Sequence, residues 1–339
     1  LEFRRVLFRS REIIHFYILK DSDIGVSKIS KKNHKKILWI ISSVIILFLI
    51  GLGIGFYYIN SKINKVQKVE INKENLSINE KKVKEEKHIK NIALFGIDAP
   101  KGKAGRSDAI MILTLDEEHK VMKLTSIMRD SYVDIPGHGD DKITHAYAFG
   151  GPELAIKTLN ENFKVNVEDF MAVNFTSLPE IIDKLGGVKI NIIPEEIHHI
   201  PGITSPGEQV LNGEQALAYS RIRYATGGDY KRTERQRVVL EAVFEKLKST
   251  PTKEYPSLID DFLPYIETNM SSMDMIKLAT DVAPLVKGNL ETARFPLDGY
   301  CDGKMINGIW YLVYDRQATL NQIQEYIYDN KNLDSFKNQ

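Results

Sequence analysis

Cysteine is nearly absent from this chain of 339 residues, which contains only Cys301. A single thiol cannot form an intramolecular disulfide, and it excludes zinc fingers that need at least two thiolates. An excess of charge of one sign is also missing, because 46 Lys and Arg residues face 45 Asp and Glu residues. Dedicated nucleic-acid binders usually carry a large basic excess, so we expect no nucleic-acid partner.

No linker rich in Pro, Gly or Ser divides the chain after residue 91, and no internal repeat is visible. Residues 91–330 therefore predict one domain, large enough to bury a substantial core, followed by a C-terminal tail at 331–339. Short apolar runs alternate with segments of helical spacing. The predicted strands cover 91–97, 108–116, 120–127, 170–175 and 188–193, and the predicted helices cover 152–163, 176–187, 213–223 and 233–248, with two more in 254–286 and one near 316–328. This alternation predicts an α/β or α+β class with helices packed over a central sheet.

One long apolar run, residues 37–59, contains no ionisable side chain except two tyrosines. At about 1.5 Å per residue, such a helix spans roughly 30 Å of hydrocarbon. Lysines without acidic residues precede the run, whereas lysine and glutamate both follow it, so residues 1–36 are predicted to be cytoplasmic. A cleaved signal peptide is the alternative, but its apolar core is usually only about 7–15 residues long. We expect a single-pass type II protein of the bacterial cell membrane.

The flanks of this span carry little fold information. Residues 1–10, LEFRRVLFRS, resemble a translated sequencing adapter, with a genuine cytoplasmic leader as the alternative, and they are excluded from fold reasoning. Residues 60–90 are rich in Lys, Glu and Asn and keep no helical period. They predict a solvated stalk outside the membrane.

Two aspartates flank a loop between the first two predicted strands: Asp98 closes one strand and Asp108 opens the next. Carboxylates at adjacent strand ends can converge on one divalent cation. Hard oxygen ligands suit Mg²⁺, with Mn²⁺ as a second choice, and Mg²⁺ typically takes one or two protein carboxylates plus substrate phosphate. Two ordinary Asx turns are the alternative interpretation.

Two further segments contain arginines that are candidate ligands. Arg129 and Asp130 directly follow an apolar strand, where a surface salt bridge worth about 0–1 kcal/mol is the plain alternative. The second place is the stretch 220–237, whose five arginines are Arg221, Arg223, Arg232, Arg235 and Arg237. Arginine offers a planar fork matched to phosphate oxygens, although a solvated charged face, or a capping box of Thr233 with Gln236, would also explain this stretch. A metal dyad with an arginine cradle at a membrane points to a pyrophosphate-bearing lipid.

These motifs resemble the LytR–CpsA–Psr family, the polyisoprenyl-teichoic acid–peptidoglycan transferases of bacterial cell walls. The resemblance covers most of 91–250 in order and spacing, and 251–339 more loosely. It is carried by NIALFGID, GRSDAIMIL, SIMRDSYVDIP, KITHAYAFGG, FMAVNF, IIDKLGGVKI, LNGEQALAYSRIRY and GGDYKRTERQR. One departure is Met128, where many members have proline.

The resemblance implies an α/β/α-like domain with a central mixed sheet that encloses an apolar channel for a polyprenyl tail. It implies transfer of an anionic glycopolymer, as its sugar-1-phosphate, from undecaprenyl pyrophosphate to a peptidoglycan hydroxyl. Asp98 and Asp108 resemble the family's Mg²⁺ pair, and Asp98 is also a candidate base. The catalytic set expected from the resemblance is Arg129, Asp98 and Asp130, and the pyrophosphate-binding set is Arg106, Arg129, Arg221, Arg223 and Arg232, supported by Asp229 and Gln236.

Two other functions use the same features. A membrane-anchored phosphohydrolase would take water as the acceptor, and a wall scaffold would bind the polyprenyl phosphate without catalysis. The apolar excess in FMAVNF, 179–185 and 238–247 predicts the lipid tunnel, with ordinary core packing as the alternative.

Overall fold

The computed structural model describes residues 66–99, 105–174, 177–222, 228–251, 257, 261–282, 284–285, 288 and 290–336. The predicted cytoplasmic tail and the apolar run 37–59 lie outside these residues. Within the described ranges, no helix is both long and apolar enough to cross a bilayer.

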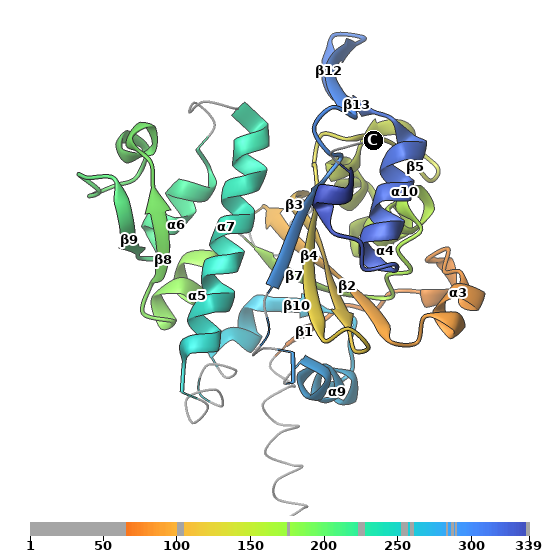
Figure 1. Ribbon diagram of the computed structural model, residues 1–339, viewed down its shortest axis with the longest axis horizontal. Helices are drawn as coiled ribbons and strands as arrows, with labels where there is room; N and C mark the ends of the chain where they lie inside the picture. The colour runs from red at the N-terminus through yellow and green to blue at the C-terminus, as the bar shows by residue number, and fades with distance from the viewer. Residues whose placement is uncertain are drawn as a thin grey trace, which may run out of the picture. The chain divides into compact units, whose positions relative to one another are not determined.

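A mixed sheet of seven strands forms the centre of the domain (Figure 1). Its order is β1 (Gln67–Lys68), β10 (Ile266–Thr268), β7 (Asp169–Asn174), β2 (Ile89–Asp98), β3 (Arg106–Asp116), β4 (Val121–Ile127) and β11 (Leu290–Phe295). The middle strands β2, β3 and β4 run antiparallel, whereas β7 and β11 pair in parallel with β2 and β4. The predicted α/β class with a central mixed sheet is confirmed.

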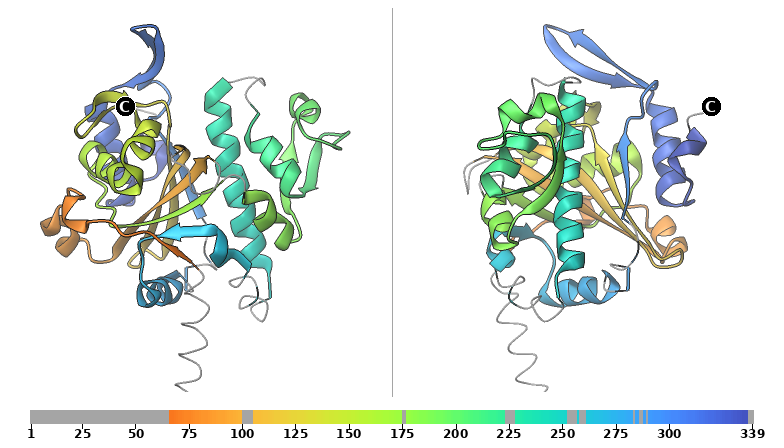
Figure 2. Two further views of the ribbon diagram at one scale, coloured as in Figure 1. Left: turned by 180° about the vertical axis from the view of Figure 1, so that it is seen from behind. Right: turned by 60° about the vertical axis from the view of Figure 1, so that its left-hand side comes forward.

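Helices cover both faces of this sheet, which explains why β2 and β3 read as continuous apolar runs. On one face, α4 (Ile143–Phe163) and α10 (Arg316–Ile327) close a core that includes Phe95, Ile112 and Phe170. On the other face, α7 (Gly228–Ser249) and α9 (Ser272–Val282) help to cover Ile92, Leu115 and Met122. The two covered faces make a three-layer α/β/α arrangement (Figure 2).

A smaller unit packs on the outer side of α7 (Figure 2). It consists of α5 (Leu178–Lys184), the hairpin of β8 (Val188–Ile192) and β9 (Gly207–Leu211), the 3-10 turn η3 (Pro194–His199) and α6 (Gly213–Ser220). α6 can approach α5 closely because its first residue is Gly213: a Cβ there would lie 2.1 Å from the carbonyl oxygen of Pro179. This packing fixes the position at which α6 ends, next to Arg221.

Most predicted elements are present, but several boundaries differ. α4 begins at Ile143 rather than near 152, with a kink at Gly150 and Gly151 where the backbone leaves helical geometry. The hairpins of β5 (Tyr132–Ile135) with β6 (Gly139–Lys142), and of β12 (Cys301–Ile306) with β13 (Ile309–Tyr314), were not predicted. In the stretch 254–286, where two helices were expected, the described residues include the short turn η5 (Leu263–Tyr265), strand β10 and helix α9.

The prediction of a solvated stalk is wrong for residues 66–90. This segment forms β1, the turn η2 (Lys73–Asn75) and α3 (Glu80–Glu85), and Leu76 within it is fully buried in the main core. The buried side chain of Asn160 donates to the Leu76 carbonyl at 2.8 Å, and Lys73 pairs with Asp169 at 2.9 Å. Isolated anchors of this kind leave no periodic pattern for sequence analysis to detect. The C-terminal segment is similar, because Phe336 in η6 (Leu333–Phe336) is also buried.

We expect Leu76→Ala to lower the free energy of unfolding by about 2–5 kcal/mol, as for other large-to-small changes in a core. Urea denaturation of the full chain would measure the loss. The control is Lys84→Ala at an exposed position of α3, which should change stability by less than about 0.5 kcal/mol. Equal stability of both variants would show that this segment is not part of the folded domain.

Candidate functional site

The adjoining ends of β2 and β3 carry the first group of predicted site residues. Asp98 ends β2 and pairs in register with Arg106, the first residue of β3. The register shifts next to this pair, since Gly96 pairs with Ala109 and Ile97 pairs with Ser107. Asp108 is therefore the extra residue of a β-bulge, a feature that re-aims side chains next to active sites.

The bulge directs Asp108 to Arg129, which lies just beyond the end of β4. The Asp108 carboxylate is fully buried, and its Oδ1 accepts a hydrogen bond from Arg129 Nη1 at 2.9 Å. The Arg129 backbone is also fixed, because its carbonyl accepts from Thr144 N at 3.1 Å. The sequence alternative of a surface salt bridge does not apply to so buried a pair.

Asp130 lies on the other side of the same guanidinium. Its Oδ2 is 3.3 Å from Arg129 Nε, and its Oδ1 is 2.7 Å from Lys142 Nζ. Charges of alternating sign thus run through Asp108, Arg129, Asp130 and Lys142. This row holds the guanidinium of Arg129 between two carboxylates, so Asp130 is placed to orient Arg129.

Arg221 brings the smaller unit to the same site. It directly follows α6, and its Nη2 lies 3.6 Å from Asp98 Oδ1. Both side chains are nearly half exposed, at 49% and 42%, so this pair is more exposed than the Asp108–Arg129 pair.

The residues of the arginine-rich stretch 220–237 differ in burial, and some of them have structural contacts. Arg235 is buried and donates to Glu196 Oε1 at 2.7 Å, so it joins α7 to η3. Gln236 is also buried, and its Oε1 finds no hydrogen-bond partner among the described residues. Since α7 begins at Gly228, Gln236 lies in the helix interior, and the capping-box alternative with Thr233 is wrong.

The structure does not describe the side chains of three predicted ligands. Arg223 lies outside the described residues. Asp229 and Arg232 lie in the first turns of α7, where the structure describes the backbone alone.

An apolar cavity of about 360 Å³ lies between the sheet and α7. This size falls within the roughly 300–1,000 Å³ range of ligand pockets. Residues of all three predicted apolar segments line it, including Met171, Ile181 and Val243. Its few polar lining residues are Asn174, Ser220 and Gln236. Along the chain, the cavity lining comes close to the charged residues: Ser220 directly precedes Arg221, Ala109 follows Asp108, and Gly96 lies two residues before Asp98.

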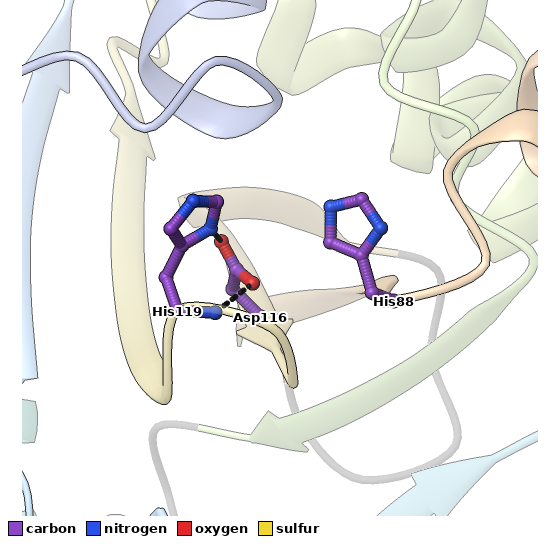
Figure 3. Close-up of side chains that lie close together, drawn as sticks. All are labelled: His88, Asp116 and His119. Atoms are coloured by element: carbon purple, nitrogen blue, oxygen red, sulfur yellow. Dashed lines mark hydrogen bonds and ion pairs between the residues drawn. The ribbon is translucent and has the colours of Figure 1, made fainter.

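Among the residues that the structure describes, two groups could hold a metal. Asp98 and Asp108 offer hard oxygen donors on neighbouring strands, a set that suits Mg²⁺. A second group, His88, Asp116 and His119, offers three ligand atoms within 4.8 Å of one another (Figure 3). There His119 Nδ1 already contacts Asp116 Oδ2 at 2.7 Å. Asp116 is the last residue of β3, whereas Asp108 lies near its start, so this group is separate from the arginine site.

Comparisons with known proteins agree on one family. The family model described as the LytR_cpsA_psr family matches residues 54–327. The polyisoprenyl-teichoic acid–peptidoglycan teichoic acid transferase TagU of Bacillus cereus is 31% identical over 288 residues, covering 82% of this chain and 92% of the relative. TagU of Enterococcus faecalis is 32% identical over 311 residues, covering 86% and 96%.

Solved structures give the same result. TagT bound to LI-WTA is 31% identical with a TM-score of 0.58, covering 71% of this chain and 91% of that chain. YwtF (TagT) with bound octaprenyl pyrophosphate lipid is 30% identical with a TM-score of 0.56, covering 72% and 91%. TagV of B. subtilis is 26% identical with a TM-score of 0.60, covering 71% and 98%.

We expect Arg129→Ala to lower the free energy of unfolding by about 3 kcal/mol, because it takes away a close partner of a buried carboxylate. The double variant Asp108→Asn with Arg129→Met should recover most of this loss, since it removes both charges. Urea titration at pH 7 would measure both. Arg316→Ala is the control, because its pair with Asp140 is about half exposed and should contribute only about 0–1 kcal/mol. A double variant less stable than Arg129→Ala would contradict this account of the pair.

Proposed function

This chain belongs to the LytR_cpsA_psr family, and we propose that it is a cell-wall glycopolymer transferase. In this proposal it moves an anionic, teichoic acid-like glycopolymer, as its sugar-1-phosphate, from undecaprenyl pyrophosphate to a hydroxyl of peptidoglycan. The relatives named above as transferases, and the related structure with a bound octaprenyl pyrophosphate lipid, support it.

The observation that carries the proposal is that an apolar cavity is lined by residues directly adjoining the arginine site in the chain. Ser220 lines the cavity, and the next residue, Arg221, reaches Asp98 at the end of β2. A polyprenyl pyrophosphate has the matching form, with a highly charged head joined to a long apolar tail. Burying the tail in the cavity would leave the pyrophosphate at Arg221 and Arg129.

The arginines would neutralise the pyrophosphate. Arg129 and Arg221, with Arg106, Arg223 and Arg232, supply planar forks that can each bind two phosphate oxygens. Asp229 and Gln236 would support them, and Gln236, whose buried Oε1 finds no partner among the described residues, lines the cavity. Such preorganised donors stabilise the charge that develops on the leaving phosphate.

Asp98 and Asp108 would hold the Mg²⁺ ion, with Mn²⁺ as an alternative. When bound, the ion would neutralise further phosphate charge. Buried Asp108 is held by Arg129, whereas half-exposed Asp98 remains open to an incoming ligand.

The transfer step needs a base and an in-line approach. The acceptor hydroxyl oxygen would form a bond to the sugar-side phosphorus, while the bond from that phosphorus to the bridging oxygen breaks and undecaprenyl phosphate leaves. Asp98 is the accessible carboxylate that could take the hydroxyl proton. Asp130, placed in the catalytic set from sequence, is buried behind Arg129, and we assign it the role of positioning that guanidinium.

The proposed reaction takes place at the outer side of the cytoplasmic membrane. We place the domain outside the cytoplasmic membrane, anchored by that span in a type II orientation, because both the lipid-linked donor and the peptidoglycan acceptor require it.

We expect Arg129→Lys and Arg129→Ala both to lose about 10²–10³ in transfer rate, because a point charge cannot replace a bidentate fork. Transfer from a synthetic polyprenyl-pyrophosphate glycan to peptidoglycan oligomers would measure it, with and without a chelator. Chelation should abolish transfer, and added Mg²⁺ should restore it.

The products distinguish the alternatives. Polymer-linked peptidoglycan supports transfer, free phosphopolymer alone indicates a phosphohydrolase, and neither product indicates a scaffold. Full activity in chelator would refute the metal assignment, and full activity of Arg129→Ala would refute the site.

The cavity makes a separate prediction. Val243→Phe should fill the space beside the sheet and lower the amount of polyprenyl lipid that copurifies with the full chain at least about five-fold, whereas Val243→Ala should keep it. Mass spectrometry of extracted lipid would measure the ratio. Equal lipid in both variants would show that the cavity does not hold the tail.

A further inference from the structure

The hairpin of β12 and β13 stands clear of the domain at the top of Figure 1 and in both views of Figure 2. Large apolar side chains are exposed at its outer part: Met305 is 65% exposed, Ile309 49% and Trp310 36%. Its turn residues Asn307 and Gly308 both have positive φ, at 51° and 80°. These values match a tight hairpin turn that suits the twist of the strands, so the backbone is preorganised.

The Trp310 side chain packs against Gly303 of the same hairpin. A Cβ on Gly303 would lie 2.7 Å from Trp310 Nε1 and 2.9 Å from Cζ2, so the indole lies across Gly303 in the space of the missing side chain. Met305 pairs with Trp310 in the ladder, and Gly303 pairs with Leu312. Leu312 is fully buried, whereas Trp310, on the same face two residues away, remains partly open to solvent.

Trp310 is linked to the arginine site through Lys142 and Asp130. The Trp310 ring centroid is 5.8 Å from Lys142 Nζ, which is 2.7 Å from Asp130 Oδ1. Asp130 in turn contacts Arg129, and the Asp130 carbonyl accepts from Leu312 N at 2.9 Å. The base of the hairpin and the guanidinium of Arg129 are therefore held by the same residue.

We propose that Trp310 and its hairpin form the binding surface for the glycan strand of the acceptor, beside the phosphate site. This proposal rests on the proposed transfer to peptidoglycan. A sugar ring has an apolar C–H face that can stack on an exposed indole, while its hydroxyls need polar partners nearby. Lys142, whose Nζ is 5.8 Å from the Trp310 ring centroid, supplies one such partner. Asp141, the residue before it in the chain, lies with its Oδ2 2.8 Å from His145 Nδ1.

A bilayer is the other surface that an apolar tip could bind, and the fold favours the glycan. β1, the first strand of the described domain, lies at the opposite end of the domain from the hairpin in Figure 1. The hairpin also lies beside Arg129, where an acceptor hydroxyl has to arrive.

Tryptophan fluorescence tests the proposal directly. The chain has two tryptophans, Trp39 and Trp310, so the full-length Trp39→Phe variant in detergent reports on Trp310 alone. We expect soluble peptidoglycan glycan oligomers, added without donor, to shift its emission in a saturable way. Vesicles of phosphatidylglycerol and phosphatidylethanolamine should not shift it.

Kinetics provide the second readout. Trp310→Ala should raise KM for the acceptor on the order of ten-fold, with kcat and the donor KM within about two-fold, and Trp310→Phe should retain most of the affinity. Val210→Ala on the β8–β9 hairpin, a 64% exposed apolar position far from this site in the sequence, is the matched control and should leave all three parameters unchanged. Thermal unfolding would show that each variant remains folded.

The outcomes separate this proposal from the transferase function. The glycan surface alone is refuted if the wild-type chain transfers polymer but the Trp310 emission does not change with glycan or changes only with vesicles. It is also refuted if Trp310→Ala leaves the acceptor KM unchanged. If Trp310 responds to glycan but no polymer is transferred, the surface stands and the proposed transfer fails.

Discussion

The buried ion pair of Asp108 and Arg129 is the interaction on which the site depends. A carboxylate without solvent exposure costs several kcal/mol in desolvation unless a close opposite charge compensates it. Here the compensation comes from Arg129 at 2.9 Å, across from the bulge of β3. Because Arg129 also contacts Asp130, and Asp130 holds Lys142 and the base of the β13 strand, one charge pair fixes several elements around a single point. The geometry of the guanidinium is thus set before a ligand arrives, which is the condition for preorganised stabilisation of phosphate charge.

The second constraint is an apolar cavity whose lining residues directly adjoin the charged residues in the chain. Protein interiors are normally close-packed, and an empty apolar cavity costs stability in proportion to its volume. A cavity of about 360 Å³ between β2, β3, β7 and α7 is therefore a feature that an apolar ligand would stabilise. The smaller unit of α5, β8, β9 and α6 contributes by packing against the outside of α7 and by delivering Arg221 to Asp98. An apolar cavity beside charged residues matches both parts of an amphipathic lipid.

The arginines show why residue type alone does not give a role. Arg221 and Arg235 belong to one basic stretch, but Arg221 is nearly half exposed beside Asp98, and Arg235 is buried against Glu196. The difference arises from α7, which turns Arg235 toward η3. Burial also separates the aspartates, since Asp98 stays accessible while Asp108 and Asp130 hold Arg129 from either side. Exposed Asp98 and Arg221 can meet substrate directly, whereas buried Asp130 and Arg235 position their neighbours.

The sequence by itself determined the class of fold, the run of strands from 91 to 127 and the family, and it predicted Asp98, Arg129 and Arg221 as site residues. Local apolar patterns and short motifs with fixed spacing make this possible, because they are properties of neighbouring residues. The tertiary structure alone decided what depends on distant contacts. Leu76 joins the core although its surroundings read as a solvated stalk, and a bulge turns Asp108 into the partner of Arg129. The position of Trp310 depends on Gly303, seven residues earlier, and on Lys142, 168 positions away in the chain and 5.8 Å from the Trp310 ring. Burial and charge pairing are set by which segments meet in space, and no local pattern records that.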